Sequence, residues 1–415
     1  MSFFPEGVAS ARPKSLTVLT SPRCDLCRYC DTAVTPKQPA RGAGAVMVVG
    51  EFPDTTADMI GKPISGPGAS LLSAVLSKHG LTTKDVVFMN ALACRPDTKK
   101  GEKDLGQAAA HCRPTVWAAI KKYAPQVIIP MGDLAVKSVL SPYWSKGSMT
   151  AARWAGYRIP VPALGAWVCP VGSPHYAAAR AVGSEDRRRT AVPAIHFERH
   201  LRHALNVMEY DAGDHRPTAT DPAAGLVLAG EAKAVEFLSQ IDRGIVAFDF
   251  ETTGLKPDRA GHKIVCCSVC WNGNETYSFM WTPAVADAMV TMLQDRRVGK
   301  IASNLKFETR WCLSRLKTRV ANWRWDTMQA AHVMDARKET TSIKFLAFVY
   351  LGVGLYDAAV QPYLESGRGG ANGLNRIDEL DRRPLLTYCG MDSRLEYLVA
   401  VRQAADLGLN LEDWK

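Results

Sequence analysis

The stretch that most constrains this chain is IVAFDFETTGL, which runs from Ile245 to Leu255. Its short apolar run lacks helical spacing and predicts a buried strand. Asp249 and Glu251 are two residues apart, so on a strand both carboxylates face the same side. Buried carboxylates repel each other unless a cation lies between them, and Mg²⁺ and Mn²⁺ favour oxygen ligands. The pattern predicts a cation site, with two incidental acids at a solvated strand end as the alternative.

Two later motifs add polar residues in a fixed order. SNLKFETRW, residues 303–311, places Asn304 and Glu308 near the start of a predicted helix. TYCGMD, residues 387–392, places Tyr388 and Asp392 one helical turn apart and on one face. The chain therefore offers three separate acidic positions that a fold could bring together.

In their order and spacing, DFETTGL, NLKFE and YCGMD resemble the three motifs of the DEDD family of 3′–5′ exonucleases. The resemblance is to the tyrosine-bearing branch, which includes the proofreading domain of bacterial DNA polymerase I. It covers residues 225–415 and implies a ribonuclease H-like fold with a mixed sheet. One departure is Glu308, where the family usually has aspartate.

This resemblance also implies a set of functional residues. Two divalent ions, Mg²⁺ or Mn²⁺, would be held by Asp249, Glu251, Glu308 and Asp392. Tyr388 would orient the attacking water. The 3′-terminal nucleotide would be contacted by Thr252, Leu255 and Asn304.

The N-terminal half contains a suggestive arrangement of cysteines, Cys24, Cys27 and Cys30 followed by Cys94 and Cys112. A C-x-x-C pair with two distant cysteines can hold zinc or an iron–sulfur cluster, and spacing alone does not choose between them. The cysteines of the C-terminal half lie in apolar patterns and are expected to be buried small side chains: Cys266, Cys267, Cys270, Cys312 and Cys389.

The N-terminal half also alternates strands with helices. Buried strands are expected at Ala45–Val49, within residues 86–96 and at the start of residues 125–140, with a helix from about Ala69. This order predicts an α/β fold with a parallel sheet covered on both faces. The glycine-containing loop after the first strand is a usual place for a ligand in such a fold.

Three segments of this half resemble family 4 uracil-DNA glycosylases: GEFPDTTADMIGKPISGPGASLL, MNALACRP and PQVIIPMGDLA. The resemblance covers residues 20–208. It implies a 4Fe–4S cluster on Cys24, Cys27, Cys94 and Cys112, with Cys30 as an alternative ligand and zinc as the alternative metal.

The departures from that family fall in the expected uracil pocket. Glu51 would activate water and Asn90 would read a base edge, as in the family. Ile64 stands where the family has a stacking phenylalanine, Ser173 stands in its His-Pro motif, and His175 is displaced by two. Loss of stacking and of a positioned imidazole predicts a domain that binds DNA but excises uracil weakly or not at all.

Charge is distributed unevenly along the chain. Residues 1–208 hold 26 Lys and Arg against 14 Asp and Glu, and the remaining residues hold 25 against 27. A basic half suits a polyanion such as DNA, although basic residues can also serve only solubility.

We expect a flexible N-terminus at residues 1–19, a glycosylase-like domain at 20–208, a linker at 209–224 and an exonuclease domain at 225–415. We also expect the segment 366–373 to be a surface loop. The sequence shows no membrane-spanning run and no signal peptide. This predicts a cytoplasmic protein, in the host cytoplasm if the source is viral, that is not secreted and binds no membrane.

The pairing of both domains resembles the N-terminal part of bacteriophage family A DNA polymerases. It implies a proofreading 3′–5′ exonuclease on single-stranded DNA 3′ ends, as a subunit or domain of a DNA polymerase. The alternatives are a uracil-excising repair enzyme with an accessory exonuclease, a non-catalytic DNA-binding replication module, and an exonuclease that acts on RNA.

Overall fold

The computed structural model describes residues 21–96, 104–182, 187–208, 216–365 and 370–412. The chain forms two compact units, the first ending at Ala219 and the second beginning at Thr220. The expected flexible N-terminus, residues 209–215 of the expected linker and residues 366–369 of the expected loop lie outside the described residues. In the described part of the chain, no helix has the length and apolarity needed to cross a membrane.

The first unit is built on a five-stranded sheet in the order β2-β1-β3-β5-β4. The pairings of β1 with β2, β1 with β3 and β3 with β5 are parallel, and β4 runs antiparallel to β5 at one edge. The expected parallel sheet is therefore confirmed, with one antiparallel edge strand. The strands are β1 (Val46–Gly50), β2 (Val86–Asn90), β3 (Val127–Pro130), β4 (Ile159–Val161) and β5 (Ala166–Val168).

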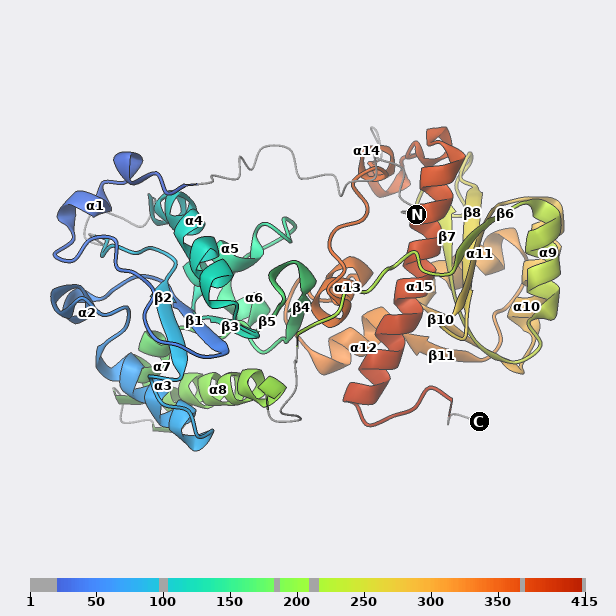
Figure 1. Cartoon of the computed structure of the whole chain (residues 1–415). Helices are drawn as coiled ribbons and strands as arrows, with labels where there is room; N and C mark the ends of the chain where they lie inside the picture. The colour runs from blue at the N-terminus through green and yellow to red at the C-terminus, as the bar shows by residue number, and fades with distance from the viewer. Residues whose placement is uncertain (1–20, 97–103, 183–186, 209–215, 366–369, 413–415) are drawn as a thin grey trace. The chain divides into compact units, whose positions relative to one another are not determined.

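Helices cover both faces of this sheet (Figure 1). Val46, Val48 and Phe88 pack with residues of α3, α7 and α8 in one apolar core. Met47 and Val49 alternate with them along β1 and therefore point to the other face, where α4 and α5 lie. The main helices are α2 (Thr55–Ile60), α3 (Gly66–Lys78), α4 (Leu105–Tyr123), α5 (Asp133–Leu140), α6 (Ala151–Trp154), α7 (Pro174–Val182) and α8 (Arg187–Leu205).

The second unit is built on a six-stranded mixed sheet in the order β11-β10-β7-β8-β9-β6. Strands β7, β8 and β9 are antiparallel, whereas β10 runs parallel to β7 and to β11, and β6 runs parallel to β9. This confirms the expected mixed sheet. The strands are β6 (Leu226–Ala229), β7 (Gly244–Thr252), β8 (Ile264–Trp271), β9 (Glu275–Met280), β10 (Val298–Ala302) and β11 (Trp323–Asp326).

Side chains alternate strictly along β7. Val246, Phe248 and Phe250 join the core formed with α9 and α10, whereas Ile245 and Ala247 pack with residues of α15. Asp249 and Glu251 follow the second series, so they face α15. Figure 1 shows α15 across the sheet from α9 and α10. The helices are α9 (Glu231–Gln240), α10 (Pro283–Gln294), α11 (Leu305–Arg315), α12 (Thr327–Met334), α13 (Ile343–Leu351), α14 (Gln361–Leu364) and α15 (Arg382–Asp406).

The five cysteines of the second unit are buried, as expected: Cys266, Cys267, Cys270, Cys312 and Cys389. Most of them fill space in apolar cores, but Cys389 also contacts polar residues, as described below.

Candidate functional site

The acidic residues expected to bind cations come from three elements of the second unit. Asp249 and Glu251 lie on β7, Glu308 lies in the first turn of α11, and Asp392 lies on α15. Glu251, Glu308 and Asp392 are 7%, 2% and 4% exposed, and Asp249 is partly exposed. The three elements place their acids 57 to 143 positions apart in the chain. The carboxylates are nevertheless neighbours in one largely buried site.

Burial and mutual repulsion make these carboxylates hard to ionise together. Burial, followed by the neighbouring Asp392, raises the pKa of Asp249 to about 7. Burial and the charge of Asp249 raise the pKa of Glu251 and that of Glu308 well above the ordinary glutamate range. Among the described residues, the buried Oε2 of Glu308 has no hydrogen-bond partner. A hard divalent cation fits this set, because it would supply both the missing charge and the missing partner.

One ammonium group partly compensates this negative charge. Lys344 on α13 forms an ion pair with Asp392, with 2.7 Å between Nζ and Oδ2. The hydroxyl of Tyr356 donates to Oδ1 of the same carboxylate. Burial alone would lower the pKa of Lys344, but the Asp392 carboxylate raises it. Both oxygens of Asp392 are therefore engaged by groups that the sequence interpretation did not identify.

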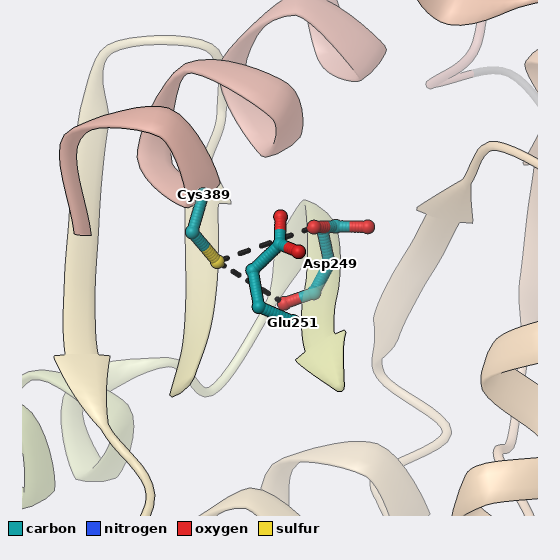
Figure 2. A group of neighbouring side chains, drawn as sticks. All are labelled: Asp249, Glu251 and Cys389. Atoms are coloured by element: carbon teal, nitrogen blue, oxygen red, sulfur yellow. Dashed lines mark hydrogen bonds between the residues drawn. The ribbon is translucent and has the colours of Figure 1, made fainter. Parts of the chain in front are cut away.

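Cys389 is a second residue whose role was not anticipated. Figure 2 shows its thiol on α15 directed at the two carboxylates of β7. The sulfur lies 3.7 Å from the carbonyl oxygen and 4.0 Å from Oδ2 of Asp249, and the ligand atoms of Asp249, Glu251 and Cys389 are all within 4.8 Å of one another. Burial raises the pKa of Cys389 well above its ordinary value, so the neutral thiol donates towards Asp249.

Tyr388 is buried beside this acidic set. The Nζ atom of Lys344 lies 4.8 Å from the centre of its ring, and the ring of Tyr356 lies 6.0 Å away. Burial, followed by the charges of Asp392 and Glu251, raises the pKa of Tyr388 well above its ordinary value. The hydroxyl thus stays protonated and can act as a hydrogen-bond donor or acceptor.

The residues expected to contact a nucleotide lie at the end of β7, in the loop after it and directly before α11. Leu255 is 58% exposed in the loop after β7. Thr252 is buried, and its hydroxyl donates to the carbonyl oxygen of Gly254 at 2.9 Å. Asn304 precedes α11 with a left-handed backbone (φ 68°), a conformation that non-glycine residues rarely adopt.

Asp326, at the end of β11, fixes the Asn304 loop. Its carboxylate accepts from the backbone N–H groups of Asn304 and Leu305, at 2.9 and 3.1 Å, and also caps α12 through Met328 and Gln329. The sequence interpretation missed this residue, although an aspartate directly before a helical segment is an N-cap signal.

Glu396 is a further acid that the sequence interpretation missed. It lies one helical turn beyond Asp392 on α15 and is 2% exposed. Burial, followed by the charges of Asp249, Glu308 and Asp392, raises its pKa well above the ordinary range. The i, i+4 spacing that links Tyr388 to Asp392 continues to Glu396 and could have identified it.

In the first unit, the polar residues expected in a uracil pocket lie at the carboxyl ends of neighbouring parallel strands. Glu51 follows β1, and its Oε1 accepts from the backbone N–H of Leu134 at 3.2 Å. The carboxylate packs against Gly132, where any Cβ would lie 2.3 Å from Cδ of Glu51. Asn90 ends β2, is 6% exposed, and donates from Nδ2 to the carbonyl oxygen of Pro63 at 2.6 Å.

The three departing residues lie close to the N-terminal ends of α3 and α7. Ile64 packs against the apolar core beneath α3 and α7. Ser173 directly precedes α7, and its carbonyl accepts from the N–H of Ala177. His175 lies in the first turn of α7, with Nε2 3.9 Å from Oδ2 of Asp54 and its ring against Gly68.

The five N-terminal cysteines line one cavity of about 150 Å³, together with Arg23, Lys37 and His111. Burial, together with the charges of the neighbouring thiols, raises the pKa of Cys94 to about 12 and that of Cys112 to about 11. The backbone N–H of Lys37 donates to the sulfur of Cys94 at 3.1 Å. A bound metal centre fits this donor set because it would stabilise several thiolates at once.

Comparison with known families identifies both units. The family described as the uracil DNA glycosylase superfamily matches residues 39–195. The family described as 3′-5′ exonuclease matches residues 228–404, a range that contains all the acidic residues described above for the second unit. The cysteines at 24, 27 and 30 precede the first matched range.

Type-4 uracil-DNA glycosylases of Archaeoglobus fulgidus and Pyrobaculum aerophilum are each 30% identical to this chain, over 27% and 28% of it. The chain spans 63% and 58% of those two proteins, less than two thirds of either. The Trypanosoma brucei RNase D structure is similar at 15% identity and a TM-score of 0.36, covering 45% of this chain and 67% of that one. The chain thus carries a uracil DNA glycosylase superfamily domain, homologous to type-4 enzymes, followed by a 3′-5′ exonuclease domain.

Proposed function

We propose that the protein is a metal-dependent exonuclease that removes nucleotides from DNA 3′ ends. One observation carries this proposal: four acids from β7, α11 and α15 share a buried site whose negative charge Lys344 compensates only in part. Asp249, Glu251, Glu308 and Asp392 would hold two Mg²⁺ or Mn²⁺ ions. When bound, such ions polarise the phosphodiester and lower the pKa of a water molecule.

The protein residues have distinct proposed tasks around this centre. The Tyr388 hydroxyl, kept protonated by burial, would orient the attacking water. Cys389 would hold the Asp249 carboxylate through its S–H group. Asp326 would keep the Asn304 loop in place, so that Asn304, Thr252 and Leu255 can steady the terminal nucleotide. The exposed apolar side chain of Leu255 suits contact with a base.

We further propose a replication role, with the exonuclease proofreading for a DNA polymerase that is a partner or a further part of the same protein. Single-stranded DNA 3′ ends would be the substrate. The fused glycosylase-like domain and the excess of Lys and Arg in residues 1–208 support DNA as the polymer.

For the first unit we propose DNA binding with weak or no uracil excision, and a 4Fe–4S cluster. Ile64 has no aromatic face, and it packs into the core. The Asn90 amide already donates to the Pro63 carbonyl, and Ser173 has no imidazole. The cluster would be held by Cys24, Cys27, Cys94 and Cys112, and the cavity that these four share with Cys30 supports it.

The exonuclease proposal predicts a large loss of activity in Asp249→Asn. The amide keeps the shape of the carboxylate but removes a charged oxygen ligand, so release of 3′-labelled nucleotide from single-stranded DNA with Mg²⁺ should fall at least ~100-fold. The matched control is Asp287→Asn, an exposed residue of α10, which should retain the wild-type rate. Equal rates for Asp249→Asn and wild type would contradict the proposed site.

Glu308 tests the one departure from the family pattern. We expect Glu308→Asp to keep or raise the rate of degradation, because aspartate is the usual ligand, and Glu308→Gln to lower it strongly. The same labelled DNA serves as substrate. A glutamine variant as active as wild type would remove Glu308 from the cation site.

The cluster proposal predicts brown protein after anaerobic purification, with about four iron and four sulfide per chain. Cys94→Ser should lose the colour because it removes a ligand buried in the cavity. Cys30→Ser is the matched control and should keep it. Colourless wild-type protein with about one zinc per chain would overturn the cluster assignment.

The glycosylase-like unit is predicted to bind DNA and to leave uracil in place. Binding to single-stranded DNA should weaken steeply as salt rises, because phosphate contacts release counterions. Alkaline cleavage of uracil-containing DNA should reveal no abasic sites above those of a thymine-containing control. Robust cleavage by wild type that is lost in Glu51→Ala would instead make uracil excision a main activity.

A further inference from the structure

We propose that Glu396 is a fifth carboxylate of the cation site and helps to hold the divalent ions. This inference rests on the proposed exonuclease function and extends its ligand set beyond the family motifs. Glu396 lies outside DFETTGL, NLKFE and YCGMD, and none of the three motifs calls for an acid at its position.

Helix geometry directs Glu396 towards the site. Tyr388, Asp392 and Glu396 are spaced four residues apart on α15, so they form one stripe along the helix. This helix packs against β7, which carries Asp249 and Glu251, and against the neighbouring strand β8. The electrostatic neighbours of Glu396 are Asp249, Glu308, Asp392 and Lys344, which come from four different elements around the centre.

One oxygen of the Glu396 carboxylate lacks the hydrogen-bond partner that a buried structural acid normally has. The residue is 2% exposed, and its Oε2 atom has no hydrogen-bond partner in the part of the chain that the structure describes. The Oε2 atom of Glu308 is in the same state. Buried acids are normally paired or coordinate a metal, because an unpaired buried charge is costly. Two unpartnered carboxylate oxygens beside the same aspartate therefore point to a shared cationic ligand.

The test is Mn²⁺ binding to the 415-residue chain. Binding is measured by titration calorimetry and by the electron paramagnetic resonance signal of free Mn²⁺. Glu396→Gln keeps the shape and removes the charge, so Mn²⁺ affinity at the weaker site should fall about 10- to 100-fold. Glu396→Asp should recover part of it. The matched control is Glu236→Gln, an exposed residue of α9, which should bind as wild type does.

Thermal unfolding separates a ligand from a structural residue. In EDTA, Glu396→Gln should unfold at the wild-type temperature or above it, because one buried like charge is gone. Addition of Mn²⁺ should raise the Tm of Glu396→Gln by less than it raises the Tm of wild type. A variant that binds Mn²⁺ like wild type, or that is destabilised equally with EDTA and with Mn²⁺, overturns the inference. The exonuclease proposal has a different contradicting result, which is degradation of DNA by Asp249→Asn at the wild-type rate.

Discussion

The second unit depends on the alternation of side chains along β7. One series of residues, including Phe248 and Phe250, fills the apolar core with α9 and α10. The other series begins with Ile245 and Ala247 against α15 and continues with Asp249 and Glu251. A shift of one residue would bury the acids in the core and expose the phenylalanines to α15. The apolar series thus fixes where the carboxylates point, and α15 brings Asp392 and Glu396 to meet them.

Lys344 is the counter-charge of the site in the structure described here. Its ammonium and the Tyr356 hydroxyl engage the two oxygens of Asp392. A cation that binds Asp392 directly must share or replace these contacts. The lysine then remains close to the rings of Tyr388 and Tyr356, which can stabilise it by cation–π interaction. Cation binding and the position of Lys344 are therefore coupled through one carboxylate.

The sequence predicted the parts of this site that local periodicity governs. The two-residue spacing of Asp249 and Glu251 and the four-residue spacing of Tyr388 and Asp392 each define a common face, and the structure has both. Lys344 and Tyr356 could not be predicted, because α13 and the loop after it reach Asp392 only through tertiary packing. Cys389 lies within YCGMD, but its contact with Asp249 arises only where α15 packs against β7. In the first unit, the sequence predicted that Glu51 and Asn90 lie at strand ends. It did not predict that the Asn90 amide donates to the Pro63 carbonyl.

The most direct test of this account is the anomalous scattering of manganese in crystals of the protein soaked with Mn²⁺. The account predicts anomalous peaks in contact with the carboxylate oxygens of Asp249, Glu251 and Asp392, with Lys344 displaced from its 2.7 Å contact with Asp392. Crystals that show no manganese at these carboxylates, with the Lys344–Asp392 ion pair intact, would contradict it.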